Sequence, residues 1–353
     1  VKVNDGVTEW FSGDFQQTAV WLRQFGWENQ FVLAHNAIFD AAILTWQFGI
    51  KPKAWLDTLC MARATLGVNT SMRLAVLAEH FGLGVKGTEV DDAKGVRRTD
   101  FSAPALAQYG EYCRNDVDLT YKLYAELNNG FPTKEKKLID LTIRMFSDPV
   151  LELDAPRLEA HLAEVRETKQ QLFTNAGITP DVLNSNKKFA ALLESFNVRP
   201  PMKISPTTNK ETYAFAKSDE DFLALQNHED ERVQALVAAR LGTKSTIEES
   251  RIERFIDVAK RNQGRLPIPL KYYGAHTGRW AGSDKVNFQN LPSRDKKKKT
   301  LKNAVVAPDG YLVINCDSSQ IEARVLAWLS GQNDLVKAFE DKQDVYKIMA
   351  SSI

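Results

Sequence analysis

The sequence predicts a multidomain protein of the α/β class. Its 353 residues exceed the usual size of a single domain. Two apolar, β-rich runs, at 31–34 and 311–316, are each followed by an apolar helical pattern, whereas the stretch between about 133 and 261 carries mainly helical patterns. We therefore expect two segments that combine strands with helices, one on each side of a helical middle.

The first strand-to-helix transition starts with Phe31–Ala34, which is predicted to be a strand. A helix is predicted over Ala41–Trp46, and the polar residues Asn36 and Asp40 lie between the two. They are four positions apart, a spacing that places side chains on one face of a helix.

A second helix is predicted from Tyr109 to about Leu127, and it carries Tyr112 and Asp116 at the same spacing. An ordinary exposed helix face would give the same pattern, so this pair alone does not indicate a site. Asp57, in a Leu-Asp-Thr-Leu run, is predicted to be a helix cap first and a site residue second.

The helical middle follows a turn predicted at 128–132, where two Asn, a Gly and a Pro cluster. Asp154 followed by Pro156 is typical of a helix start, and this helix is predicted to reach Phe173. Further helices are predicted at 189–196 behind an Asn-Ser-Asn cap, at 229–239 and at 246–261, and the proline-rich stretch 198–210 is predicted to be a loop.

The last strand-to-helix transition places a carboxylate at a junction. Tyr311–Cys316 is predicted to be a buried strand, and Ile321, Val325 and Leu329 recur behind it at helical spacing. Asp317 stands between strand and helix. A carboxylate held rigidly at such an exposed edge suits a hard divalent cation, although a single Asp after a strand is more commonly a cap or turn residue.

Two C-terminal stretches resemble a known family. The run at 317–331, DSSQIEARVLAWLSG, resembles the first palm motif of family A DNA polymerases of the bacterial polymerase I type, with a continuation similar to bacteriophage members. The stretch at 277–294, TGRWAGSDKVNFQNLPSR, resembles the segment that leads into that palm. They occur in the family's order and at about its spacing, so together they indicate a member of this family.

The resemblance implies template-directed DNA synthesis, in which two Mg²⁺ ions join a primer 3′-hydroxyl to an incoming deoxynucleoside triphosphate. Asp317 corresponds to a metal-binding aspartate, and the backbone carbonyl of Ser318 to a second ligand. Glu322 corresponds to the residue that crowds the 2′ position of the nucleotide and so disfavours ribonucleotides. Many members carry Tyr where this chain has Ser318.

The same resemblance assigns residues that contact DNA. Arg279 corresponds to an arginine that reaches the minor groove at the primer end, where a donor tests pair shape with little dependence on sequence. Polar residues expected near the primer and template are Thr277, Asn287, Gln289, Asn290 and Arg294. The chain has one residue more than the commonest spacing between Arg279 and Asn287. The lysines at 296–299 fit a solvated loop better than a phosphate clamp.

The N-terminal pairs resemble the second and third motifs of 3′→5′ exonucleases with four acidic residues, the proofreading domain fused to family A polymerases. This resemblance implies an RNase H-like fold in which Asp40 and Asp116 bind two metal ions. Tyr112 would orient the attacking water, and Asn36 would be a neighbouring polar residue. The family's first motif, Asp-x-Glu on a strand, is not found in residues 1–30.

The helical middle corresponds to the thumb of family A polymerases, which lies along the primer–template duplex. Lys244 and Ser245, in the run RLGTKST at 240–246, correspond to thumb residues that hold DNA phosphates. The alternative is a capped helix pair with an exposed lysine.

We therefore predict an exonuclease domain without its first motif at 1–130, a helical thumb at 131–262, and the first part of the palm with the start of the fingers at 263–353. The palm sheet is expected to be antiparallel and incomplete, with an exposed edge. The second palm aspartate and the fingers helix that grips the triphosphate are not found, so we expect a chain truncated at both ends and inactive alone. A partner subunit with the missing polymerase half is the alternative.

Composition sets further limits. The net charge of +1, from 46 basic and 45 acidic residues, argues mildly against avid non-specific DNA binding. No apolar run is long enough to span a membrane, and three cysteines without metal-ligand spacing indicate a reduced, cytoplasmic protein. The expected partners are primer–template DNA and deoxynucleoside triphosphates. The rival functions are a non-catalytic primer–template binding module and a stand-alone 3′→5′ exonuclease with a helical tail.

Overall fold

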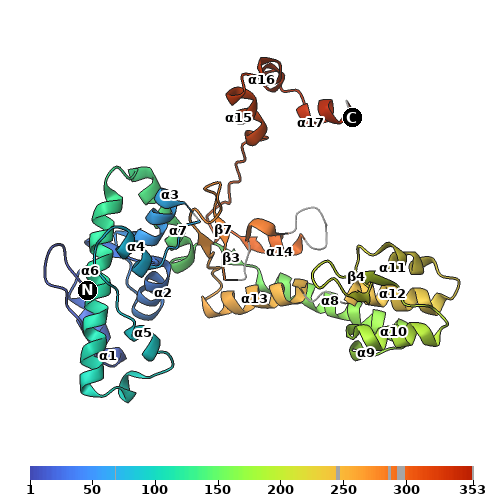
Figure 1. Cartoon of the computed structure of the whole chain (residues 1–353), viewed down its shortest axis with the longest axis horizontal. Helices are drawn as coiled ribbons and strands as arrows, with labels where there is room; N and C mark the ends of the chain where they lie inside the picture. The colour runs from blue at the N-terminus through green and yellow to red at the C-terminus, as the bar shows by residue number, and fades with distance from the viewer. Residues whose placement is uncertain (68, 244–246, 285–287, 292–298, 352–353) are drawn as a thin grey trace. The chain divides into compact units, whose positions relative to one another are not determined.

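The computed structural model describes residues 1–67, 69–243, 247–284, 288–291 and 299–351 (Figure 1). They form two compact units, Val1–Pro308 and Asp309–Ile353. Each unit has hydrophobic clusters of its own. No helix in the described part of the chain is both long and apolar enough to cross a bilayer.

A small parallel sheet organises the N-terminal part of the larger unit. β1 (Phe31–Ala34) pairs in parallel with β2 (Ala54–Asp57), and α2 (Ala37–Phe48) connects them, because parallel neighbours need a crossover. The register places Ala34 opposite Asp57, so α2 and α3 (Thr58–Leu66) start at the same end of the sheet. β1 confirms the predicted strand.

α7 (Thr133–Ser147) is bound through two side chains to the backbone of β2 and of the residues just before it. Asp140 accepts the Trp55 N–H at 2.8 Å and the Arg144 Nε–H at 3.0 Å. Arg144 also donates from Nη2 to the Pro52 carbonyl at 2.8 Å. The bond to Trp55 satisfies an edge group of β2, which pairs only with β1 among the described strands, and the bond to Pro52 holds the residues just before β2, so α7 covers part of the open sheet edge.

α6 (Ala103–Asn128) is the longest described helix of this region. It starts before the predicted Tyr109, because Ser102 caps it by accepting the Ala105 N–H and Pro104 stands in its first turn. It ends before Gly130, whose φ of 75° confirms the predicted turn. The remaining elements here are α1 (Phe15–Arg23), η1 (Trp27–Asn29), α4 (Leu74–His80), α5 (Glu89–Asp92) and η2 (Arg98–Asp100).

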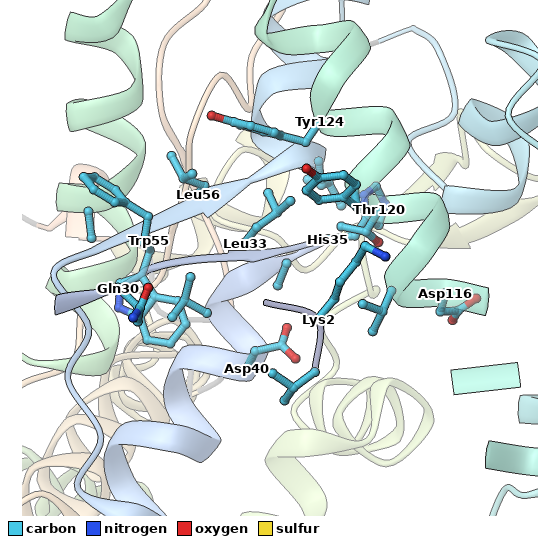
Figure 2. A pocket seen from close by; sticks show the side chains of 18 of the residues that line it. Lys2, Gln30, Leu33, His35, Asp40, Trp55, Leu56, Asp116, Thr120 and Tyr124 are labelled. Atoms are coloured by element: carbon cyan, nitrogen blue, oxygen red, sulfur yellow. The ribbon is translucent and has the colours of Figure 1, made fainter. Parts of the chain in front are cut away.

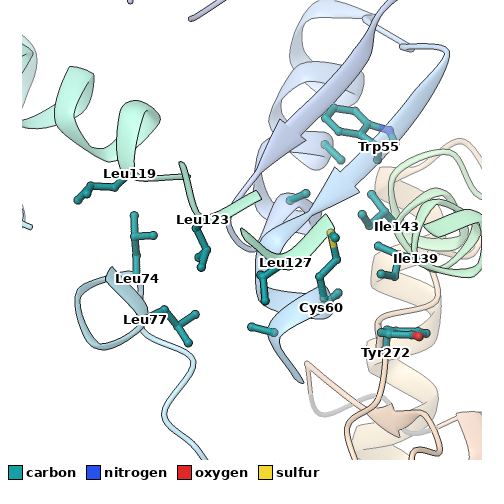
Figure 3. Packing of buried hydrophobic residues seen from close by; sticks show 14 of the residues in the cluster. Trp55, Cys60, Leu74, Leu77, Leu119, Leu123, Leu127, Ile139, Ile143 and Tyr272 are labelled. Carbon is teal, nitrogen blue, oxygen red and sulfur yellow. The ribbon is translucent and has the colours of Figure 1, made fainter. Parts of the chain in front are cut away.

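One hydrophobic cluster joins β2, α3, α4, α6 and α7 (Figure 3). Trp55 is 1% exposed, and Leu77 and Leu123 are fully buried. Full burial of such a side chain contributes about 1.5–3 kcal/mol. The cluster therefore fixes α6 against the sheet, and α2 contributes Ala37 and Ala41 to the same core.

The middle of the chain is helical, as predicted. The Asp154 carboxylate caps α8 (Ala155–Ala176) by accepting the Arg157 N–H at 3.1 Å. α12 (Glu231–Thr243) and α13 (Ile247–Arg261) pack against α8. The shorter helices are α9 (Pro180–Asn184), α10 (Asn186–Ser195), α11 (Glu220–Ala224) and η3 (Leu225–Asn227), and Ser185 caps α10 as the sequence predicted.

The prediction that 198–210 is entirely loop was wrong. β4 (Met202–Ile204) pairs antiparallel with β5 (Glu211–Tyr213), and Asn209 turns the chain with a φ of 53°. The prolines of this stretch stand outside the paired residues, so they remove no bond of the ladder. The ring of Tyr213 stacks on Phe215 at 5.4 Å between centroids, which adds packing to the hairpin.

Short antiparallel pairs involve strands of the segment predicted as palm, 263–353, and one strand from the segment predicted as thumb, 131–262. β3 (Glu152–Leu153) pairs with β8 (Val305–Val306), and β6 (Leu270–Lys271) pairs with β7 (Ala281–Gly282). Each strand is two residues long. η4 (Phe288–Asn290) and α14 (Thr300–Asn303) complete the described elements of the larger unit.

The smaller unit consists of α15 (Ile321–Leu329), α16 (Asn333–Glu340) and α17 (Val345–Ser351). Its buried residues are Ala327, Phe339 and Val345. α15 confirms the helix predicted behind Asp317.

The prediction of a buried strand at Tyr311–Cys316 was wrong. These residues form no strand, and Leu312 and Ile314 are 89% and 87% exposed. A strand is stabilised by pairing of its N–H and C=O groups with a neighbour. No described segment of the smaller unit pairs with this run, so the predicted strand has no partner strand within that unit.

Candidate functional site

A cavity of about 1520 Å³ opens beside the parallel sheet (Figure 2). Asp40 from α2 and Asp116 from α6 both line it, together with Leu33 and Leu56 from the two strands. The structure therefore brings the two predicted acidic residues to one space, although they are far apart in the sequence. Apolar walls with a few polar groups are typical of a ligand site.

Asn36 is the N-cap of α2 and does not share a helical face with Asp40. Its backbone is left-handed, with φ 71° and ψ 49°, which places its side chain outside the helical repeat. Asp40 lies in the first turn of α2. The spacing of four predicted a shared face, and that prediction was wrong for Asn36 because the helix begins one residue after it.

Asp57 ties the starts of α2 and α3 together. Its buried carboxylate accepts the N–H groups of Asn36 at 3.0 Å and Ala37 at 3.1 Å, and that of Leu59 at 2.8 Å. The Cys60 thiol also donates to it at 3.2 Å. The predicted cap of α3 is confirmed. Asp57 also binds the first N–H groups of α2, a contact that no local sequence pattern predicts. Asp57 thereby fixes the turn that leads to Asp40.

Burial dominates the electrostatics of Asp40. Removal from water raises the pKa of its carboxyl to about 6, and the charge of Asp57 adds to this. Asp40 is half-buried, and a carboxylate that is costly to ionise gains from a nearby cation. Asp40 is therefore suited to hold a positively charged ligand.

Asp116 forms a cluster with Lys86 and Tyr112. The Lys86 ammonium donates to the Tyr112 Oη at 2.5 Å and forms an ion pair with Asp116 Oδ2. The same nitrogen lies 4.3 Å from the centroid of the Tyr112 ring. Burial, together with the Asp116 carboxylate, raises the pKa of the Tyr112 hydroxyl, which therefore stays protonated at neutral pH.

Sequence reasoning missed Lys86. It lies in the loop between α4 and α5, in the run GLGVKG, which carries no motif. Only the tertiary structure brings this loop to α6.

His35 is a structural neighbour of the site. Its Nε2 lies 2.8 Å from the Met72 carbonyl and its Nδ1 lies 2.9 Å from the Thr58 hydroxyl. Because a carbonyl only accepts, Nε2 carries the proton and Nδ1 accepts from Thr58. Burial lowers the pKa of His35, so the imidazole is neutral and links the start of α3 to the loop before α4.

The cavity carboxylates fit a hard divalent cation in their chemistry. One oxygen of Asp116, Oδ1, is buried and has no hydrogen-bond partner among the described residues. A cation would satisfy it. The described residues contain no group of three or more His, Cys, Asp or Glu side chains arranged to hold a metal ion. Asp140 also lines the cavity, but its carboxylate already accepts from the Trp55 N–H and from Arg144, so Asp40 and Asp116 are the carboxylates left for a cation.

Two of the predicted DNA-contacting residues, Thr277 and Arg279, lie on a tight turn. Ala275 donates its N–H to the Arg279 carbonyl at 3.1 Å, and Gly278 donates to the Ala275 carbonyl at 3.0 Å. Gly278 has a φ of 79°, and an added Cβ would lie 2.9 Å from the Tyr273 ring. Only glycine fits there, so Thr277 and Arg279 are presented from a fixed backbone.

This turn is anchored to α7 through Trp280. Its indole Nε1 donates to the Thr142 hydroxyl at 2.9 Å, and its carbonyl accepts the Gln289 side-chain amide at 2.8 Å. Gln289 and Asn290 belong to η4. The other predicted DNA-contacting residues, Lys244, Ser245, Asn287 and Arg294, lie outside the described residues.

In the smaller unit, Asp317 and Ser318 are exposed and precede α15. Gln320, with a φ of 55°, is the N-cap of α15, so Asp317 does not have the cap role that was its alternative. Glu322 stands in the first turn. Arg324 donates from Nε to the Ser319 carbonyl at 2.9 Å and holds this segment to the helix.

Comparison with known families shows which class of protein this chain belongs to. Residues 155–353 match the family model of DNA polymerase family A, and residues 20–131 match that of a 3′-5′ exonuclease. The chain thus combines polymerase-type and exonuclease-type parts. Because the polymerase match spans more than half of the sequence, the chain belongs to DNA polymerase family A, which confirms the predicted family.

Curated relatives are bacterial proteins named DNA polymerase I. That of Pseudomonas aeruginosa is 27% identical over 275 residues, 74% of this chain and 29% of the relative. That of Chloroflexus aurantiacus is 26% identical over 341 residues, 91% of this chain and 35% of the relative. The thermostable enzyme of Thermus aquaticus is 36% identical over 100 residues, 28% of this chain and 12% of the relative. The chain spans about a third of the length of the first two.

Among solved structures, the POL domain of Pol1 from M. smegmatis, in complex with DNA primer-template and dNTP, is similar with a TM-score of 0.58. The sequences are 20% identical, and the match covers 90% of this chain and 53% of that chain. This likeness supports the fold: a mixed helical and sheet protein with exonuclease-type and polymerase-type parts.

Proposed function

We propose that this chain is part of an enzyme for template-directed DNA synthesis that carries a 3′→5′ proofreading domain. The observation that carries the proposal is the polymerase-family match over 155–353, which includes Arg279, Asp317 and Glu322. The substrates are primer–template DNA and deoxynucleoside triphosphates. The activity is proposed for the whole protein, since the chain covers 29% and 35% of two relatives.

In the polymerase part, Asp317 and the Ser318 backbone carbonyl bind Mg²⁺. Two such ions lower the pKa of the primer hydroxyl and neutralise the triphosphate. The exposure of both residues in front of α15 supports this role. Glu322, in the first turn of the same helix, crowds the 2′ position of the nucleotide.

Arg279 and Thr277 contact the primer end of the duplex, with Gln289 and Asn290 nearby. The rigid turn at 275–279 supports this assignment, because a donor that tests pair shape in the minor groove must be held in place. The four residues outside the described ranges complete the proposed contacts with the primer, the template and the duplex phosphates: Lys244, Ser245, Asn287 and Arg294.

Primer–template binding tests this part, measured by fluorescence anisotropy with a labelled primer. Arg279→Ala is expected to weaken binding about tenfold. Arg261→Ala is the matched control, since this arginine is exposed and pairs with Asp257 on its own helix. Equal weakening by both variants would reduce the interaction to general charge attraction and refute the role of Arg279.

Primer extension in Mg²⁺ is expected to be absent for the 353-residue chain alone. The sequence contains no His-Asp pair of the kind that carries the second palm aspartate in this family. Carboxylates that share two cations act as a unit, so one of them alone is insufficient. Extension above a blank would contradict this prediction. Duplex binding without extension or degradation would describe the chain as a binding module.

In the N-terminal part, we infer an RNase H-like 3′→5′ exonuclease site. Its support is the parallel β1–β2 pair with its crossover helix, and the two carboxylates on one cavity. Asp40 and Asp116 would hold Mg²⁺, which activates the attacking water and neutralises the phosphate charge. The Tyr112 hydroxyl, protonated at neutral pH, orients that water. Asn36 fixes the turn before Asp40 through its backbone bond to Asp57.

Degradation of 3′-labelled single-stranded DNA tests this site. We expect trace Mg²⁺-dependent loss of 3′ nucleotides by the chain, and its disappearance in Asp116→Asn. Asp118→Asn is the matched control, because Asp118 lies on the same helix but binds Thr8 and Lys2. Equal degradation by Asp116→Asn and the unaltered chain would exclude Asp116 from the reaction.

A further inference from the structure

The loop that carries Lys86 is built onto α6. The Val85 carbonyl accepts the Asn115 side-chain amide at 2.9 Å, and the Leu83 carbonyl accepts from the Lys122 ammonium at 3.4 Å. Both bonds hold the residues just before Lys86. A Cβ on Gly87 would lie 3.2 Å from the Tyr112 ring, so the loop also passes close to that ring on the other side.

The Lys86 side chain is aimed into the cluster rather than into solvent. It is 18% exposed, against 27% for Asp116, its ion-pair partner. Exposed lysines of the same region behave differently: Lys94 is 73% exposed and pairs with Asp91 on the surface. A lysine with little contact with water is retained where its charge has a partner.

We propose that Lys86 is a resident cation that neutralises Asp116 and holds the Tyr112 hydroxyl while the site carries no divalent ion. A divalent ion must displace its ammonium from Asp116 to bind there. This inference rests on the proposed nuclease-type metal site and adds a positioning residue to it. Lys86 acts through Asp116 and Tyr112.

The geometry supports exchange between the two cations. Asp116 binds Lys86 through Oδ2 and leaves Oδ1 buried without a hydrogen-bond partner among the described residues. A carboxylate with one oxygen engaged and the other buried and unpaired gains from a divalent ion that contacts both. The lysine side chain is flexible, and Lys86 belongs to a loop outside α6, with Gly87 directly after it. Rotation of the side chain alone would therefore take the ammonium away from Asp116.

The consequence is a testable competition. Removal of the ammonium by Lys86→Met is expected to tighten Mn²⁺ binding about tenfold, which corresponds to about 1.4 kcal/mol. Lys86→Arg keeps the charge and is expected to bind Mn²⁺ like the unaltered chain. A merely structural lysine would give the opposite order, because Lys86→Met would then loosen the site and weaken binding.

The experiment is isothermal titration calorimetry of the 353-residue chain with MnCl₂ after removal of metal by chelation. Lys94→Met is the matched control, since it removes one positive charge from the neighbouring segment without contacting Asp116. It is expected to change the dissociation constant less than about twofold, because exposed charges are screened by solvent. Asp116→Asn should abolish this Mn²⁺ binding both in the chain with Lys86 and in Lys86→Met.

A second measurement guards against partial unfolding. The rise in melting temperature on adding MnCl₂ should be larger for Lys86→Met than for the unaltered chain, because tighter binding to the folded state stabilises it more. Circular dichroism checks that the variant retains its helices.

The outcomes separate the two proposals. Mn²⁺ binding that Asp116→Asn abolishes, with no tightening by Lys86→Met, overturns the competition and leaves the metal site in place. Weaker binding by Lys86→Met also overturns it. No Mn²⁺ binding by any variant overturns both the competition and the proposed metal site.

Discussion

The buried carboxylate of Asp57 offers the sharpest test of how the site is built. Asp57→Ala removes the acceptor for the N–H groups of Asn36, Ala37 and Leu59, in a position that is 2% exposed. A hydrogen bond to a charged group contributes about 1.5–3 kcal/mol. Some of the freed N–H groups will regain water, so we expect a loss of about 3–5 kcal/mol rather than the full sum.

The assay is native-state hydrogen exchange read by mass spectrometry, because it reports α2 and α3 separately from the rest of the chain. Since each 1.4 kcal/mol is a factor of ten, protection of these helices should fall at least about a hundredfold. Asp14→Ala is the matched control: Asp14 also caps a helix, accepting the Gln17 N–H at 2.8 Å, but it is exposed. That loss should be about 1 kcal/mol and confined to α1. Equal losses for the two variants would refute the two-helix role of Asp57.

Two further predictions follow from buried charges. Because burial raises the folded-state pKa of Asp40 to about 6, its ionised form costs stability above that pH, and the cost disappears as the pH falls from 6 towards 4. Asp40→Asn should therefore be more stable than the unaltered chain by about 2–3 kcal/mol at pH 8 with chelator present, and by less than about 1 kcal/mol at pH 4. Urea unfolding at the two pH values checks this, and equal stability at pH 8 would contradict it. Arg240 is fully buried against Phe189 and Phe215, and its Nε and Nη1 have no hydrogen-bond partner in the described part of the chain. Arg240→Met should leave the free energy of unfolding unchanged within about 1 kcal/mol or raise it. Arg240→Ala should lower it by about 2–4 kcal/mol, because it leaves a cavity. A large fall in the melting temperature of Arg240→Met would mean that the guanidinium itself is required.

Local signals predicted much of the fold. The strand at 31–34, the Asp154 cap of α8 and the Ser185 cap of α10 depend on neighbours within a few residues, so the sequence contains them directly. The hairpin at 202–213 was missed because prolines suggested a loop, although they stand outside the ladder.

Features that depend on distant partners were not predictable. The run at 311–316 has the composition of a strand, but pairing decides whether a strand forms. Lys86 carried no local pattern, and only the docking of its loop on α6 reveals it. The joint placement of Asp40 and Asp116 followed from the family resemblance, because their separation in sequence gives no geometric constraint.

The assigned site residues beyond this cavity stay predictions. Asp317 and Arg279 belong to the two separate units, and Lys244, Ser245, Asn287 and Arg294 lie outside the described residues. The turn that holds Arg279 and the exposure of Asp317 are compatible with their proposed roles, and the binding experiment with Arg279→Ala addresses the first of them directly.

The central claim is that Asp40 and Asp116 hold a divalent cation in one cavity, and iron-mediated cleavage of the backbone tests it most directly. Fe²⁺ bound in place of Mg²⁺ reduces added H₂O₂ to hydroxide and a hydroxyl radical and is itself oxidised to Fe³⁺, which added ascorbate reduces again. The hydroxyl radical cuts the chain next to the ion. We predict cuts near residues 36–40 and 112–116 in the same molecules, suppressed by excess Mg²⁺ and absent in Asp116→Asn. Cuts at only one of these segments, or a pattern that Asp116→Asn leaves unchanged, would contradict the shared site.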